Sequence, residues 1–182
     1  MTAFSGAIKF YARNLIDEAT VTASSAATPA TRIQNPRPSR RWFATGKTSE
    51  YVQVDFGGLV LISHVALVGF NLDAQGRFDV RLSNAADFSG SDVRAVLDVE
   101  AWEPVVGLGD DPLGESLGGY PVLNSFNDYR AYRTVDLGAI SAARYLRVVL
   151  RNPTNALIAQ VGLGWLFAGV PFQPEWNFDW DW

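Results

Sequence analysis

Hydrophobic and polar side chains alternate along several short stretches of this chain. In residues 51–56, two valines and a phenylalanine occupy every second position, and the same period returns in residues 77–84 and 144–151. A period of two places alternate side chains on opposite faces of an extended chain, so each stretch predicts a β-strand with one buried face. The side chains predicted to face the core are Val52, Val54, Phe56, Phe78, Val80, Leu82, Leu146, Val148 and Leu150.

Shorter or less regular patterns predict further strands. Residues 20–25 alternate weakly. Residues 59–69 form an apolar run after the glycine pair 57–58, which predicts a turn between two strands. Residues 92–102 and 156–167 are further strand candidates, and two glycines in the second of them predict a bulge.

No stretch of the chain shows the period of an amphipathic helix. Pro29, Pro36 and Pro38 exclude a continuous helix from residues 14–39, which are expected to form an ordered loop region. Several strands joined by turns, without helices, predict an all-β fold. The fold class expected is a two-sheet antiparallel β-sandwich of the jelly-roll type.

The length of 182 residues suits one domain with a single core. The sandwich is expected to cover residues 1–168, with a long loop insertion at about 103–133. Five glycines in residues 107–119 mark that insertion. Residues 169–182 are expected to form an aromatic C-terminal tail.

Composition excludes several classes of protein. Hydrophobic residues make up 48% of the chain and aromatic residues 13%, which is typical of a globular protein. The absence of cysteine excludes disulfides, thiol catalysis and cysteine-bound zinc. The net charge of −4 weighs against a general nucleic-acid binder. No apolar run is long enough for a membrane helix and no secretory signal is recognisable, so synthesis in the cytoplasm without membrane insertion is expected.

Candidate catalytic groups are few. His64 is the only histidine, so a Ser-His-Asp triad would have to use it. It lies in an apolar run, which favours a buried structural histidine, and neither a phosphate-binding loop nor a His-Glu-x-x-His metal motif occurs. A carboxylate pair for glycoside hydrolysis stays open, because the separation of two carboxylates is set by tertiary structure. The chain is predicted not to be an enzyme and to need no cofactor.

The glycine-rich loop contains three acids, Asp110, Asp111 and Glu115. Carboxylate oxygens are the ligands that calcium prefers, although the spacing is not that of an EF-hand. Two interpretations stay open: a calcium site and, more strongly favoured, a solvated loop.

Charge is distributed unevenly along the chain. Residues 19–49 contain no acid, and residues 169–182 contain no base but three acids. The two segments are electrostatic complements, although such a pattern also arises by chance on a solvated surface. The bases of the first segment are Arg32, Arg37, Arg40, Arg41 and Lys47.

Large aromatic side chains recur at every second position near the C-terminus. In an extended chain they would share one face, and a monomer rarely leaves so large an apolar patch in water. The tail therefore either folds back on its own sandwich or docks on another subunit, and docking is the sharper hypothesis. The predicted interface residues are Phe172, Trp176, Phe178, Trp180 and Trp182.

A second candidate site lies at one loop end of the predicted sandwich. Planar donors and an aromatic face are what sugar binding uses, and Arg40, Arg41, Trp42, Asn71 and Arg77 supply both. These residues are predicted to line a ligand or interface loop. The alternative is that Trp42 caps the core while the arginines pair with acids or carbonyl groups.

Several short motifs follow one another along the chain. They are Trp42, the strand end Asp55-Phe56-Gly57, the pair Ile62 and Val65, and the late strand 144–148. In this order they resemble the discoidin, or coagulation-factor C-type, galactose-binding-like domains over roughly residues 14–167. The resemblance implies a galactose-binding-like sandwich. The chain departs from secreted members of that group because it has no cysteine pair and because its 101–133 insertion is long.

Three further segments are similar to tail-associated structural proteins of tailed bacteriophages. They are residues 35–42, residues 69–72 and the closing segment 169–177. This resemblance implies a structural, non-enzymatic virion protein of the tail or tail tip, made in the host cytoplasm. Its partners would be other tail proteins, in a homo-oligomer or ring. The alternative function is a carbohydrate-binding module that attaches to a glycan of the host-cell surface.

Overall fold

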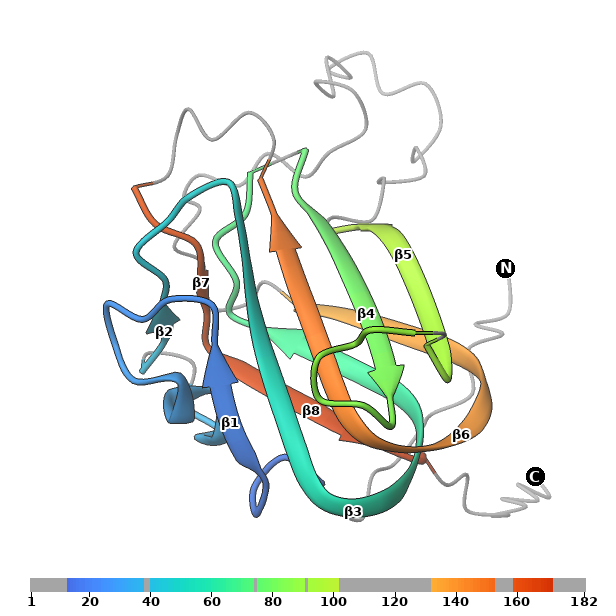
Figure 1. Cartoon of the computed structure of the whole chain (residues 1–182). Helices are drawn as coiled ribbons and strands as arrows, with labels where there is room; N and C mark the ends of the chain where they lie inside the picture. The colour runs from blue at the N-terminus through green and yellow to red at the C-terminus, as the bar shows by residue number, and fades with distance from the viewer. Residues whose placement is uncertain are drawn as a thin grey trace, which may run out of the picture.

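The computed structural model contains eight strands and one short 3-10 helix in the part of the chain that it describes (Figure 1). The described residues are 13–37, 40–73, 75–90, 92–101, 132–152 and 159–171. The elements are β1 (Thr20–Ala23), η1 (Ala30–Gln34), β2 (Trp42–Phe43), β3 (Ser49–Val68), β4 (Arg77–Ser83), β5 (Arg94–Glu100), β6 (Tyr132–Arg151), β7 (Gly162–Leu163) and β8 (Trp165–Gly169).

The strands form an antiparallel sandwich, which confirms the predicted fold class. The main sheet has the order β1-β3-β6-β4-β5, and β8 pairs with β3 outside this path. Strands β2 and β7 form a separate two-stranded sheet. Figure 1 shows β1, β3, β6, β4 and β5 in a front layer, while β8 runs behind them.

Strands β3 and β6 belong to both layers. The first part of β3, up to Asp55, pairs with the last part of β6, and the rest of β3 pairs with the first part of β6 and with β8. The register between β3 and β6 shifts between Asp55 and Val60. Each long strand therefore turns from one layer into the other, as Figure 1 shows at the lower edge of the molecule.

The same four-residue motif lies at the bend of both long strands. Asp55 and Asp136 each follow a valine, and each accepts through Oδ1 the backbone N–H of the glycine two positions later, at 2.8 Å. Gly57 and Gly138 have φ angles of 75° and 76°. This left-handed conformation is open to glycine and strained for most other residues. The Val-Asp-x-Gly motif thus lets a strand bend without ending.

Two local predictions differ from this structure. Residues 57–58 were predicted to form a turn between two strands, and that prediction is wrong, because β3 continues through them with a bulge. A local glycine signal is the same for a turn and for a bulge. At the other end of the chain, the predicted strand 156–167 is interrupted at Gly164 into β7 and β8, and its residues 156–158 lie outside the described residues.

The core lies between the layers and contains the side chains that the alternating pattern predicts. The inward residues of β3, β4 and β6 are fully buried, except Phe56, which is partly buried and packs against the core. Phe70 and Phe78 meet edge to face with ring centroids 5.0 Å apart. The fully buried inward residues are Val52, Val54, Phe78, Val80, Leu82, Leu146, Val148 and Leu150.

Most of the predicted insertion and of the aromatic tail lies beyond what the structure describes. Within the described residues, no helix is long and apolar enough to span a membrane.

Candidate functional site

Helix η1 is held against the sandwich by one apolar side chain and one amide. Ile33 is fully buried in the core. The Gln34 Nε2 donates to the carbonyl oxygens of Ile16 and Ala19, at 2.8 and 2.9 Å. Because side chains three apart share one side of a 3-10 turn, anchoring through Ile33 turns its neighbours away from the core. Arg32 is accordingly exposed.

The loop that follows η1 brings a second arginine to the same place. The backbone N–H of Arg40 donates to the carbonyl of Arg37 at 2.9 Å, which holds these two residues close together. The carbonyl of Arg41 accepts hydrogen bonds from Thr28 Oγ1 at 2.9 Å and from Arg32 Nη1 at 3.3 Å. These bonds tie the loop to η1, so that Arg32 and Arg40 border the same opening.

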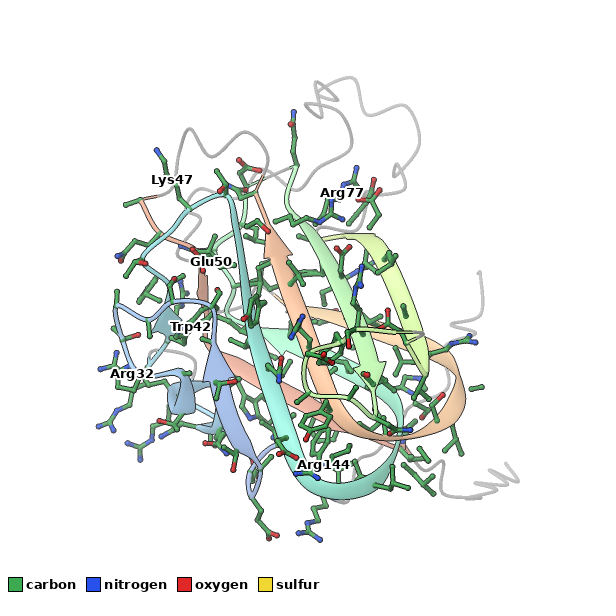
Figure 2. The ribbon with its side chains drawn as sticks, in the orientation of Figure 1. Arg32, Trp42, Lys47, Glu50, Arg77 and Arg144 are labelled. Atoms are coloured by element: carbon green, nitrogen blue, oxygen red, sulfur yellow. The ribbon has the colours of Figure 1, made fainter. Side chains whose placement is uncertain are left out.

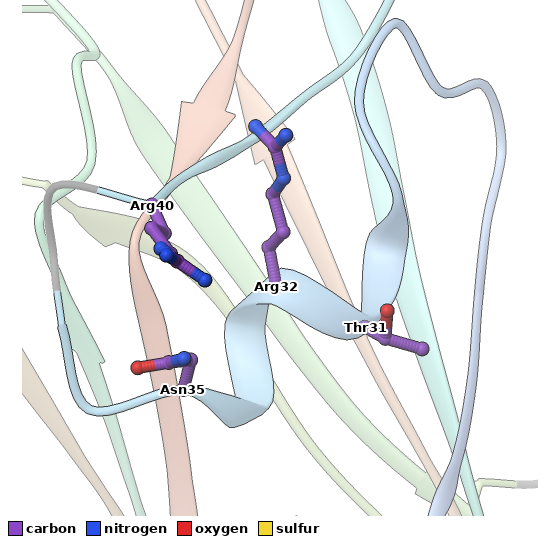
Figure 3. A pocket seen from close by; sticks show the side chains of 4 residues that line it. All are labelled: Thr31, Arg32, Asn35 and Arg40. Carbon is purple, nitrogen blue, oxygen red and sulfur yellow. The ribbon is translucent and has the colours of Figure 1, made fainter.

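An open pocket of about 500 Å³ lies between η1 and this loop. Figure 3 shows Thr31 and Arg32 on η1, Asn35 at its end and Arg40 on the loop, and these four residues line the pocket. The volume falls within the range of small-molecule binding sites. All four of these side chains are polar and two carry a positive charge, while no aromatic ring lines the pocket within the described part of the chain.

The polar groups of this pocket are largely unpaired within the described residues. The Arg40 guanidinium and the Thr31 hydroxyl make no hydrogen bond there, and Asn35 uses only its Oδ1, which accepts the Arg37 N–H at 3.0 Å. No described carboxylate pairs with Arg32 or Arg40. The pocket therefore presents several donors that a ligand can use.

The acids at the two ends of the acid-free segment 19–49 are engaged elsewhere. Glu18 forms an ion pair with Arg13. Glu50 accepts a hydrogen bond from the Ser25 hydroxyl at 2.8 Å. Neither carboxylate compensates the positive charge around the pocket.

Arginines on the outer face of the front layer pair with carboxylates, unlike the arginines of the pocket. Arg144 donates through Nε and Nη2 to the two carboxylate oxygens of Asp55, at 2.9 and 3.0 Å. These hydrogen bonds hold the pKa of Asp55 below its ordinary value. Arg151 Nη2 likewise donates to Asp79 at 2.7 Å. These arginines have carboxylate partners, which leaves their donors less available to a ligand than those of the pocket.

Of the five residues predicted to line a loop-end site, Arg40 is the one that lines this pocket. Arg41 is 3% exposed and Trp42 is fully buried. The indole Nε1 donates to the carbonyl of Ser25 at 3.1 Å. Trp42 thus fills the core, in agreement with the alternative that it caps the core, and offers no ring face to a ligand in the pocket.

The remaining two predicted residues also have structural partners. Asn71 accepts the backbone N–H of Gly162 at 2.7 Å and donates to the carbonyl of Gln160 at 2.8 Å, so it holds the strand β7 in place. Arg77 pairs with Glu100 at 2.6 Å. Figure 2 shows Arg77 on the opposite side of the molecule from Arg32. The structure does not bring the five predicted residues together.

Other predicted site residues lie outside the described residues. They are the tail residues Phe172, Trp176, Phe178, Trp180 and Trp182, and the acids Asp110, Asp111 and Glu115.

His64 occupies a structural position. It is 8% exposed, its Nδ1 lies 2.9 Å from Ser63 Oγ, and its Nε2 lies 3.3 Å from a carboxylate oxygen of Asp136. The three residue types are those of a hydrolase triad, but the Ser63 side chain is buried beside its neighbour on the same strand. A nucleophile must reach its substrate, so this arrangement fits a bond between β3 and β6 better than catalysis.

Comparison with solved structures identifies the fold. No protein-family model matches the sequence, and no curated protein matches it. Chitosan-binding module 1 of a chitosanase/glucanase from Paenibacillus sp. IK-5 matches with a TM-score of 0.58 and 15% identity, over 87% of this chain and 99% of that one. The lectin domain of lectinolysin, complexed with Lewis b antigen, matches with a TM-score of 0.56 and 18% identity, over 88% and 98%. The CBM32 module of AlyQ, complexed with 4,5-unsaturated mannuronic acid, matches with a TM-score of 0.53 and 17% identity, over 82% of this chain and 93% of that one.

The chain has the galactose-binding-like fold of these modules. At identities of 15–18% the matches establish the shared sandwich and nothing about the ligand. The predicted galactose-binding-like fold is thereby confirmed. None of these matches connects the chain with phage tail proteins.

Three pocket residues were missed as site residues by the sequence analysis. Thr31 and Asn35 are common residue types in a proline-bearing loop, and no spacing rule links them to Arg40. The available signal was the acid-free segment 19–49, which singled out Arg32 as a base without assigning it a site.

Proposed function

We propose that the chain is a non-catalytic carbohydrate-binding module whose ligand occupies the pocket between η1 and the Arg40 loop. The observation that carries the proposal is the set of planar donors in this pocket, most of which are unpaired within the described residues, on a galactose-binding-like sandwich. Guanidinium and amide groups are suited to the hydroxyl and ring oxygens of a sugar, because each presents hydrogen bonds in a fixed plane.

The ligands of the structural neighbours support a glycan in general and no particular sugar. They bind chitosan, Lewis b antigen and an unsaturated mannuronic acid, which are chemically different. Side chains of this chain must therefore select the sugar. The binding role also agrees with the buried, bonded state of His64.

Binding to a panel of neutral and acidic oligosaccharides tests this proposal. We expect the purified protein to bind at least one class, and expect the double variant Arg32→Ala, Arg40→Ala to bind it about tenfold more weakly or worse, since a hydrogen bond to a charged group contributes about 1.5–3 kcal/mol. No reducing sugar should be released during the assay.

Arg94→Ala is the matched control for those substitutions. Arg94 is also exposed and has no described carboxylate partner, and it lies on β5, at the other edge of the main sheet from β1. Its removal should leave glycan binding unchanged. If no oligosaccharide of the panel binds, or if all variants bind like the wild type, the pocket is not a glycan site.

A structural role in a phage tail is the second candidate function. It is favoured by an apolar surface at the bend of the two long strands. Leu61 faces Ala142 across β3 and β6, and Leu59 and Ile140 lie two positions away on the same face of each strand. Leu59 is 68% exposed, and Leu61 and Ile140 are each 59% exposed. Clusters of this kind mark protein contacts.

We expect this apolar surface to contact a second copy of the chain. Sedimentation velocity over a range of concentrations should show self-association that Leu61→Lys abolishes, because burying an unpaired ammonium at an interface is costly. Tyr132→Lys is the control, since Tyr132 is 71% exposed and is the first residue of β6, where it pairs with Val68 away from the bend. A wild-type protein that stays monomeric at every concentration would rule out this contact.

A further inference from the structure

Among the residues that the structure describes, the pocket has no aromatic ring, the feature on which neutral sugars usually depend. Neutral rings gain much of their binding from stacking on an aromatic face, and the lining of Thr31, Arg32, Asn35 and Arg40 includes none. Trp42 follows directly in the sequence but is fully buried. Within the described residues, binding energy in this pocket has to come from polar contacts.

Those polar contacts carry uncompensated positive charge. Arg32 and Arg40 line one opening, and no described carboxylate pairs with either. Two like charges close together repel each other, and an anion between them removes that repulsion. The Arg32 guanidinium is already held through Nη1 by the carbonyl of Arg41, which fixes its position while leaving its other N–H groups for a ligand.

We infer that the sugar taken by this pocket is acidic, with a carboxylate that lies between Arg32 and Arg40. The inference rests on the proposed glycan-binding function and names the class of ligand. A guanidinium matches a carboxylate through two parallel N–H···O bonds, which are stronger than bonds to neutral hydroxyl groups. Asn35 and Thr31 then remain for the hydroxyl groups of the same sugar.

The whole chain is acidic, so the positive charge at the pocket is a local feature of the surface. The net charge is −4, yet residues 19–49 hold five bases and no acid. A general attraction to polyanions is therefore not expected, and recognition has to be local to the pocket. Short acidic oligosaccharides are better probes than long polyanions, which the rest of the surface repels.

Two matched pairs of probes test the inference by calorimetric titration. The first pair is tri-galacturonic acid and its methyl ester. The second pair is sialyllactose and its methyl ester, so that a uronic and a sialic carboxylate are tested separately. We expect at least one acid to bind about tenfold or more tightly than its uncharged partner, because the partner cannot form charge-assisted bonds. Raising the salt to about 0.5 M should weaken the acid's binding and leave the neutral partner's unchanged.

Variants locate the carboxylate. Arg40→Ala should weaken binding of the acid about tenfold and binding of the ester less than about twofold, while Arg40→Lys should fall between because an ammonium is a point charge without the planar fork. Arg94→Ala should change neither. Since Arg40 is exposed, unchanged thermal unfolding of each variant shows that folding is not the cause.

The outcomes separate this inference from the proposed function. Acid and ester binding with equal affinity, both sensitive to Arg40→Ala, would overturn the acidic class and keep the glycan pocket. Tighter binding of the acids that persists in Arg40→Ala would place the carboxylate elsewhere and overturn the inference too. Absence of binding to every oligosaccharide would overturn the proposed function itself.

Discussion

Replacing Trp42 with alanine is expected to lower the free energy of unfolding by about 3–5 kcal/mol, the usual cost of truncating a large buried aromatic side chain. Trp42 is fully buried, and its indole is among the largest side chains in the core. The indole Nε1 also donates to the carbonyl of Ser25 at 3.1 Å. The substitution leaves a cavity and an acceptor without its partner. Urea unfolding followed by circular dichroism measures the change.

Trp42→Phe is the control for this substitution. It keeps an aromatic ring in the cavity and removes the hydrogen bond to Ser25, so the free energy of unfolding should fall by about 1–3 kcal/mol. The loop that carries Arg40 joins the core at Arg41 and Trp42, so the alanine variant should also bind ligand more weakly at temperatures where it remains folded. An alanine variant as stable as the wild type would mean that the indole is not in the core.

Replacing Asn14 with alanine is expected to cost about 2–4 kcal/mol, because it leaves at least two buried backbone groups without partners at about 1–3 kcal/mol each. Asn14 Oδ1 accepts the N–H of Ala168 at 3.1 Å and that of Ile16 at 3.2 Å. Its Nδ2 donates to the carbonyl of Leu166, also at 3.1 Å, and to Asp17. The amide thus joins the start of the described chain to the edge of β8, and all of its hydrogen-bonding capacity is used.

Two further substitutions test whether the amide itself is responsible. Asn14→Asp keeps the acceptor but loses the donor to Leu166 and places a carboxylate beside Asp17, so it should be as destabilising as alanine near neutral pH. Asp17→Ala removes only a partly exposed partner and should have a small effect. Thermal unfolding of the three variants compares them. Equal stability of Asn14→Ala and Asp17→Ala would show that the bonds to β8 contribute little.

Both residues bear on the proposed binding pocket because the elements that line it are held by contacts with the core and with neighbouring loops. Helix η1 is five residues long and is held by Ile33 and by the Gln34 amide, whose acceptors Ile16 and Ala19 lie in the segment that Asn14 anchors. Loosening that segment should therefore also loosen Arg32. The pocket depends on polar side chains that bond loop backbone far from it in the sequence.

Sequence patterns identified the strands well and their continuity poorly. The period of two in residues 77–84 predicted β4 almost to its ends, because a strand with one buried face needs that period. The glycine pair 57–58 predicted a turn where β3 bends and continues. The pairing with β6 decides in favour of a bend, because β6 pairs with β3 both from Ser49 to Asp55 and again from Val60 onwards.

Candidate site residues were harder to place. Arg40 and Trp42 are two positions apart, and their sequence neighbourhood suits a surface site and a core cap equally well. In the structure Arg40 is exposed and Trp42 is fully buried. In a strand, the period of two shows which side chains face the core. A loop has no such period, so its sequence does not show which side chains are buried.

The sequence by itself determined that this chain forms an antiparallel sandwich, since a period of two along residues 51–56, 77–84 and 144–151 leaves one face of each strand to bury. It also determined that one segment, residues 19–49, is basic without acids. Only the tertiary structure decided that Arg32 and Arg40 border one pocket while Asp55 and Arg144 neutralise each other. Charge pairing depends on distances of a few ångströms between side chains, and these are fixed only when the loops dock on the core.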